Sequence, residues 1–159
     1  MDETVKNLIS SRGYHFEYVP CILPDKDETG EIRKFEPQCR YKNTHKLRLH
    51  KHGRGPFCRF RISRSLNTEG TYLLIVNGVV QYVGECKNLS SRFNSGYGQI
   101  SPRNCFCGGQ ITNCKINQLI LKAAEDGNQI ELWFFKNQNR KKVEEELIAN
   151  LNPPPPWND

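Results

Sequence analysis

The fold is decided by GTYLLIVNGVVQYVG, which occupies residues 70–84 of the 159-residue chain. Two apolar runs flank Asn77-Gly78, and an Asn-Gly pair between β-branched residues is the strongest short-range signal for a β-hairpin. Each run carries one tyrosine, Tyr72 before the turn and Tyr82 after it. The sequence therefore predicts two antiparallel strands that each present a phenol.

The type of turn decides whether the two tyrosines share a face of the sheet. A strict two-residue loop at Asn77-Gly78 would place Tyr72 opposite Val83 and the tyrosines on opposite faces. A three-residue loop, with Gly78 in the left-handed region as a bulge, would place Tyr72 directly opposite Tyr82. The sequence permits both turns. A site shared by both tyrosines requires the second, so we predict the bulged hairpin.

Hydrophobic spacing predicts the elements around the hairpin. Asn88 can cap a helix that runs through Arg92, and apolar periodicity predicts further helices at 3–11, 117–124 and 140–151. Apolar runs predict strands at 14–23 and 130–135. Alternating basic and apolar residues predict a half-exposed two-stranded ribbon at 46–50 and 57–62.

Residues 67–159 resemble the GIY-YIG nuclease family, because four signals occur in the family's order. The two signature segments read Thr71-Tyr72-Leu73 and Tyr82-Val83-Gly84. The stretch 85–93 is similar to the helix that carries the family's arginine, here Arg92. Residues 143–148 resemble its metal-binding glutamate helix, and Pro156-Trp157-Asn158 resembles its closing asparagine. The resemblance implies an α+β fold with a small, mixed three-stranded sheet flanked by helices.

Charge is distributed unevenly along the chain. Residues 1–32 carry a net charge of −4, residues 33–64 carry +10, and residues 65–159 are neutral. We therefore expect two parts: a basic N-terminal arm or subdomain at 1–66 that contacts DNA, and a nuclease domain at 67–159. A concentrated basic block indicates a polyanion such as nucleic-acid phosphate; a solvated basic face without a partner is the alternative.

Two groups of residues are expected to contact DNA. Basic side chains in the middle segment would bind phosphates; they are Arg48, Lys51, Arg54, Arg59 and Arg61. The amides of Gln110 and Asn113 could read base edges. A capped turn before a helix explains the stretch 108–113 equally well.

The resemblance implies hydrolysis of DNA phosphodiester bonds with one divalent ion, Mg²⁺ or Mn²⁺, per active site. Glu144 would hold the ion, although Glu145 is an alternative, and one carboxylate with waters and phosphate oxygens suits magnesium. Tyr72 would act as a base or position the attacking water, and Tyr82 would share the site. Arg92 would clamp the scissile phosphate. Supporting contacts with phosphate, substrate or the metal shell are expected from Lys87, Tyr97 and Asn158.

The cysteines and the apolar runs indicate the cellular compartment and bear on whether the protein binds zinc. Seven cysteines, an odd number at scattered positions, indicate reduced thiols in a cytoplasm. Cys105, Cys107 and Cys114 invite a zinc site, but their spacing departs from paired Cys-x-x-Cys knuckles, so zinc is not expected. No apolar run is long enough to cross a membrane and the N-terminus is acidic, so we expect neither a membrane partner nor a signal peptide.

The sequence is therefore interpreted as a stand-alone, restriction- or phage-endonuclease-like enzyme. A module that kept the fold and binds nucleic acid without cutting it is the first alternative. A zinc-stabilised interaction protein is the second. A double-strand break would require a dimer or two successive nicks, and the sequence reveals no oligomer interface.

Overall fold

All residues from Met1 to Asp159 are described by the computed structural model of the protein. The chain folds into two units, each assembled from segments that are distant in the sequence. The first unit contains Met1–Ile22, Ser63–Ser90 and Asn128–Asp159; the second contains Leu23–Ile62 and Ser91–Gly127. These units cross the expected boundary at residue 66, because the first 22 residues belong with the hairpin. The DNA-contacting role of residues 1–66 stays a prediction.

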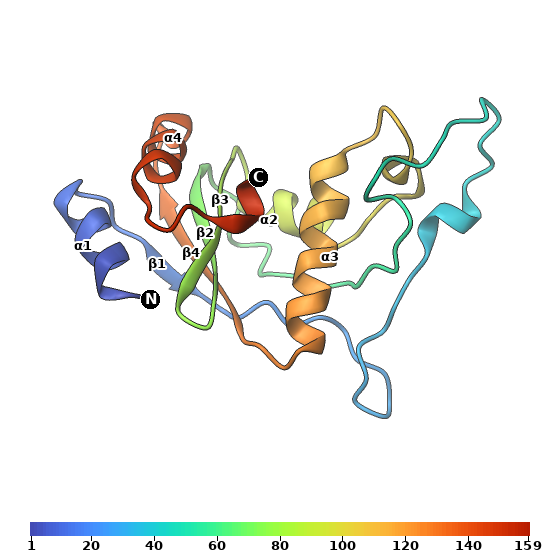
Figure 1. The fold of residues 1–159 in the computed structure, drawn as a ribbon, viewed down its shortest axis with the longest axis horizontal. Coiled ribbons are helices and arrows are strands. Elements are labelled where there is room, and N and C mark those ends of the chain that lie inside the picture. Colours follow the sequence, from blue (N-terminus) through green and yellow to red (C-terminus); the bar gives the residue numbers. More distant parts are fainter. The chain divides into compact units, whose positions relative to one another are not determined.

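The first unit is built on one antiparallel sheet with the strand order β1-β4-β2-β3 (Figure 1). The strands are β1 (Glu17–Val19), β2 (Gly70–Val76), β3 (Val79–Cys86) and β4 (Ile130–Lys136). The predicted α+β class is confirmed. The predicted mixed, three-stranded sheet is wrong, because β1 adds a fourth strand beside β4 and every pairing is antiparallel. Tyr18 lies opposite Trp133 there, with ring centroids 5.6 Å apart.

The hairpin turn contains two residues rather than the predicted three. Asn77 and Gly78 both have positive φ angles, +51° and +81°, and Val76 pairs directly with Val79. These are the angles of a turn whose twist matches that of the strands, and Asn-Gly adopts it readily. The predicted bulge therefore does not lie at Gly78.

A bulge lies farther along β3 instead. Ile75 pairs with Val80 while Leu74 pairs with Tyr82, so Gln81 is the extra residue. Tyr72 consequently lies opposite Gly84 rather than Tyr82. Because side chains alternate along a strand, Tyr72 and Tyr82 share one face. Their ring centroids are 6.1 Å apart, so the predicted sharing of a face is confirmed, although the predicted pairing is wrong.

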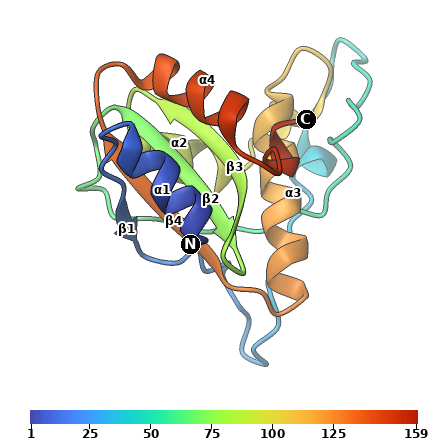
Figure 2. The same cartoon turned by 60° about the vertical axis from the view of Figure 1, so that its left-hand side comes forward.

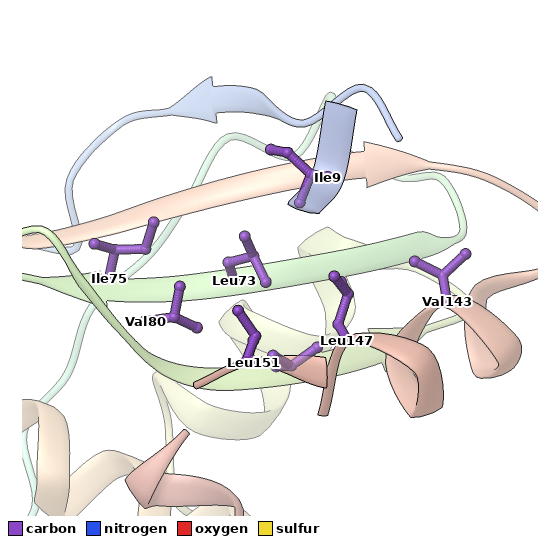
Figure 3. Packing of buried hydrophobic residues seen from close by; sticks show 8 residues of the cluster. Ile9, Leu73, Ile75, Val80, Val143, Leu147 and Leu151 are labelled. Carbon is purple, nitrogen blue, oxygen red and sulfur yellow. The ribbon is translucent and has the colours of Figure 1, made fainter. Parts of the chain in front are cut away.

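The opposite face of the sheet carries the core of the first unit. Leu73 and Ile75 of β2 lie there beneath two helices, α1 (Glu3–Ser11) and α4 (Arg140–Asn150) (Figures 2 and 3). Ile9 of α1 and the α4 residues Val143 and Leu147 are all less than 9% exposed. Burial of such side chains contributes roughly 1.5–3 kcal/mol each.

A polar contact joins α4 to the segment that follows α1. The Tyr14 hydroxyl donates a hydrogen bond to Glu146, and the Arg12 guanidinium lies 3.4 Å from the same carboxylate. The Tyr14 hydrogen bond, reinforced by Arg12, lowers the pKa of Glu146. Burial and the Glu146 contact raise the pKa of Tyr14.

The second unit contains one long helix and much irregular chain. Helix α3 (Ile111–Glu125) begins six residues earlier than the sequence predicts, while short helical turns form at Pro37–Arg40 and Pro102–Cys105. The predicted ribbon is wrong: Leu49 forms a bridge with Phe106, and Phe57 forms one with Phe35. The two segments pair with other parts of the chain and not with each other.

Three short elements complete the chain. They are α2 (Leu89–Arg92), a π-helical turn (Phe93–Tyr97) and a C-terminal 3-10 turn (Pro156–Asn158). Even α3, at 15 residues, falls short of a membrane span, and no other helix combines the length and apolarity that crossing a bilayer requires.

We expect Gly84→Ala to destabilise the protein by about 1–3 kcal/mol, because overpacking a filled space costs that much. A Cβ at Gly84 would come within 3.0 Å of the ring end of Tyr72. The measurement is the free energy of unfolding in denaturant. Gly96→Ala is the control, because a Cβ there meets nothing closer than 3.5 Å. In a Tyr72→Leu background Gly84→Ala should cost much less; an equal cost in both backgrounds would contradict this packing.

We expect Glu146→Gln to flatten the loss of stability in acid. A carboxylate with a lowered pKa stabilises the fold above its unfolded pKa, and this contribution disappears as the pH falls through the folded pKa. The wild type should therefore be more stable than the variant at pH 7 and should converge with it in strong acid. Unfolding curves from pH 7 to pH 3 measure this. Glu145→Gln, with the same charge change at an exposed site, should leave the pH profile unchanged.

Candidate active site

The tyrosine pair depends on a glycine opposite it. Tyr72 is fully buried, Tyr82 is half-buried, and the ring of Tyr72 lies over Gly84 of the neighbouring strand. Any side chain at Gly84 would collide with the Cζ and hydroxyl oxygen of Tyr72. The glycine of the second signature segment therefore makes room for the tyrosine of the first.

The structure distinguishes the three consecutive glutamates of α4. Val143 and Leu147 face the sheet, and about 100° separates successive residues on a helix. Glu144 and Glu146 therefore project from opposite flanks, while Glu145 points away from the sheet and is exposed. Glu146 is held by Arg12 and Tyr14 on the α1 side.

The flank of α4 that carries Glu144 lies over the outer edge of the sheet. Helix α4 packs on β2 and on the edge strand β3 (Figure 2), whereas Tyr14 packs against Phe135 of β4, with ring centroids 5.5 Å apart. Glu144, which projects away from the Tyr14 side, therefore faces the β3 edge and is half-buried there. This position favours Glu144 over Glu145 as a ligand near the hairpin.

Asn158 grips the same strand edge. Its Oδ1 accepts a hydrogen bond from the Val83 amide at 2.9 Å, and its Nδ2 donates to the Val83 carbonyl at 2.8 Å. The side chain thus takes the place of a neighbouring strand and joins the C-terminal segment to β3. A contact of Asn158 with a metal shell or with phosphate stays a prediction.

Arg92 and Tyr97 occupy the π-helical turn and its start. The Arg92 guanidinium carbon lies 6.0 Å from the centroid of the Tyr97 ring, at the outer limit of a cation–π contact. Tyr97 is 1% exposed, and its ring packs edge-on against Phe93 at 5.3 Å. The structure thus places these two predicted residues together in the second unit.

Asn117 is a residue of this region that the sequence reasoning missed. It is fully buried in α3, and its Nδ2 donates to the Tyr97 carbonyl at 2.7 Å. The same amide binds both the N–H and the carbonyl of Cys58, at 2.9 and 2.8 Å. A polar residue on the apolar stripe of a helix, between Ile116 and Ile120, is the signal that could have identified it.

The basic residues expected to contact DNA differ in their availability. Four are exposed, namely Arg48, Lys51, Arg54 and Arg61. Arg59 is half-buried and its guanidinium stacks on the Phe35 ring, 4.1 Å from the centroid. Lys87 is exposed directly after β3 and forms no ion pair.

The two amides expected to read base edges are not equivalent. Gln110 is exposed at the start of α3, whereas Asn113 is 4% exposed and donates to the Gln110 side chain at 2.8 Å. Of the two, only Gln110 presents its side chain at the surface.

The chemistry of the donors fits one hard cation held by few protein ligands. No three His, Cys, Asp or Glu side chains gather into a metal-binding group in the structure. The Glu144 carboxylate is a suitable ligand for magnesium, which completes its shell with waters and substrate oxygens. Burial raises the pKa of the Cys114 thiol to about 12.

Comparisons with known proteins leave the family open. No family model matches the chain, and no curated protein matches it. A solved structure of a mutant of bacteriophage T4 EndoII is similar in fold over 97% of this chain and 98% of that chain, with 15% identity and a TM-score of 0.48. Similarity at this level does not assign an activity.

We expect Asn158→Asp to destabilise the protein by about 1–3 kcal/mol, because it removes a donor and places a carboxylate against the Val83 carbonyl. Thermal unfolding measures the loss. Asn139→Asp, an exposed change of the same kind at the N-cap of α4, serves as the control and should not destabilise, because a negative charge is favourable at a helix N-terminus. Equal melting temperatures for Asn158→Asp and the wild type would show that the grip on β3 contributes nothing.

Proposed function

We propose that this protein is a metal-dependent endonuclease of the GIY-YIG type that hydrolyses DNA phosphodiester bonds. The observation that carries the proposal is the tyrosine pair on one face of an antiparallel hairpin, with Gly84 opposite Tyr72. Glu144 at the outer edge of the same hairpin and the order of the signature residues support it.

Hydrolysis requires that a water attacks the phosphorus while the bond to the leaving 3′ oxygen breaks. The Tyr72 hydroxyl is proposed to position that water or accept its proton, with Tyr82 hydrogen-bonded to the substrate beside it. A cation on Glu144 would supply Lewis acidity toward the phosphate oxygens.

The other proposed residues bind the phosphate and hold the site in shape. The fork of the Arg92 guanidinium suits two phosphate oxygens and would neutralise charge that accumulates in the transition state. Lys87 would bind a backbone phosphate beside the one that is cut, and Tyr97 would support Arg92. Asn158 would keep the C-terminal segment on β3, as its two hydrogen bonds to Val83 indicate.

DNA is the proposed substrate because of the charge of the chain. The segment 33–64 has a net charge of +10, and Arg48, Lys51, Arg54 and Arg61 are exposed. Phosphate contacts from such residues would provide binding that weakens with salt. All seven cysteines are free, which suits action in a reducing compartment such as the cytoplasm.

A second candidate function is binding of nucleic acid without cleavage. The burial of Tyr72 favours it, because a hydroxyl that is fully covered cannot reach a substrate without movement of its surroundings. Tyr82, which is half-buried, is the tyrosine with an accessible part.

Cleavage of supercoiled plasmid with Mg²⁺ or Mn²⁺ tests the proposal. The wild type should produce nicked or linear DNA. Arg92→Ala and Glu144→Ala should each reduce the rate by about 10²–10³-fold, the loss seen when one group that stabilises a transition state is removed. Glu145→Ala, one position away and exposed, is the matched control and should retain the activity.

Each result has a distinct meaning. Loss of activity in Glu145→Ala but not in Glu144→Ala would move the proposed ligand to Glu145. Discrete fragments would indicate sequence-specific cutting, and a smear would indicate cutting without sequence preference. A wild type that binds DNA and never cuts with either ion would replace the nuclease with the binding module.

A further inference from the structure

We infer that a cavity at one end of the sheet, between Lys87 and Lys136, binds a DNA backbone phosphate other than the one that is cut. The inference rests on the proposed function, because it takes nucleic acid as the partner. The cavity has a volume of about 490 Å³ and lies wholly in the first unit. The residues that line it are all of polar or charged type, namely Thr68, Glu69, Lys87, Lys136, Asn137 and Gln138.

The strand register brings the two lysines to the same place. Gly70, the first residue of β2, pairs with Cys86 on one side and with Lys136 on the other. Lys87 follows Cys86 directly, so the two lysines flank the start of β2 from neighbouring strands. Residues separated by 49 positions in the sequence therefore face one cavity.

The charge of the cavity favours an anion. Lys87 and Lys136 are both exposed and neither forms an ion pair. The single acidic residue of the lining, Glu69, lies 3.7 Å from the Arg140 guanidinium. Arg140 also lies 2.9 Å from Glu85, in an orientation that is electrostatic rather than hydrogen-bonded. Arg140 thus shares its one positive charge between two acids, so the two lysines, Arg140 and the two glutamates together carry a net charge of +1.

The hydrogen-bonding groups favour phosphate over an apolar ligand. The Asn137 amide nitrogen is turned inward, where it donates to the Phe135 carbonyl at 2.9 Å. The Thr68 hydroxyl and the Gln138 amide remain to supplement the lysines. Lysine binds phosphate as a point charge, and a volume in the range of small-ligand sites accommodates a phosphate with part of its sugar.

The experiment measures DNA binding without cleavage, in EDTA, at several salt concentrations. Removing one phosphate contact should lower the slope of log affinity against log salt by about 0.9 for duplex DNA. We expect this decrease for Lys136→Gln, and a larger loss of affinity for Lys136→Glu. Lys136 is exposed, and circular dichroism checks that the variants fold.

Lys6→Gln is the control for the lost charge, although Lys6, unlike Lys136, forms an ion pair, with Glu3 at 3.5 Å. It removes one exposed lysine from the same unit, but α1 starts beside the hairpin turn, where the Asp2 amide donates to the Gly78 carbonyl at 3.2 Å. That end of the sheet is opposite to the cavity. Lys6→Gln should therefore leave the salt slope of the wild type unchanged.

Each outcome supports or overturns the inference. A lower slope for Lys136→Gln alone supports it, even if the wild type cuts no plasmid, in which case only the nuclease proposal fails. Equal slopes for both variants overturn it while plasmid cleavage stands. Calorimetric binding of inorganic phosphate that Lys136→Gln abolishes, combined with equal slopes, would overturn it in favour of a site for a free anion. A wild type that does not bind DNA overturns both proposals.

Discussion

The extra residue at Gln81 is the constraint on which the first unit depends. A strand alternates its side chains between two faces, so one inserted residue reverses the assignment of every position after it. The insertion turns Val83 toward the core beside Leu73 and moves Tyr82 to the face of Tyr72. If Gln81 instead paired with Leu74 in a regular ladder, Tyr82 would lie opposite Leu73 on the core face, and Gly84 would no longer lie opposite Tyr72. The hairpin therefore combines a tight turn, which joins the strands, with a separate bulge, which determines the face of the sheet on which the later side chains of β3 lie.

Asparagine side chains bind backbone groups in places where no neighbouring strand does so. Asn43, Asn94, Asn117 and Asn158 each bind both the N–H and the carbonyl of one backbone residue. An amide offers one donor and one acceptor at the spacing of a peptide group, so it satisfies an irregular segment without a neighbouring strand. Three of these four pairs of hydrogen bonds lie in the second unit, where regular structure is sparse.

Local signals in the sequence predicted the local structure well. Asn77-Gly78 located the turn, and apolar spacing located α1, β4 and α4 to within a residue or two. The pairing of β1 with β4 and the bridge from Leu49 to Phe106 join segments far apart in the chain, and no local pattern encodes such partners. The site followed the same division. The motif predicts the tyrosines as site residues, and this stays a prediction, whereas a preference among the three glutamates requires knowing which flank of α4 faces the segment after α1.

The two hydrogen bonds between Asn158 and Val83 also bear on how this chain can associate with other polypeptides. Strand β3 ends the sheet, and an open strand edge is a template on which another polypeptide can add itself as a further strand. The C-terminal turn covers that template at its middle, where Asn158 occupies both hydrogen-bonding groups of Val83. The C-terminal residues thus also occupy part of the edge on which another polypeptide could add a strand.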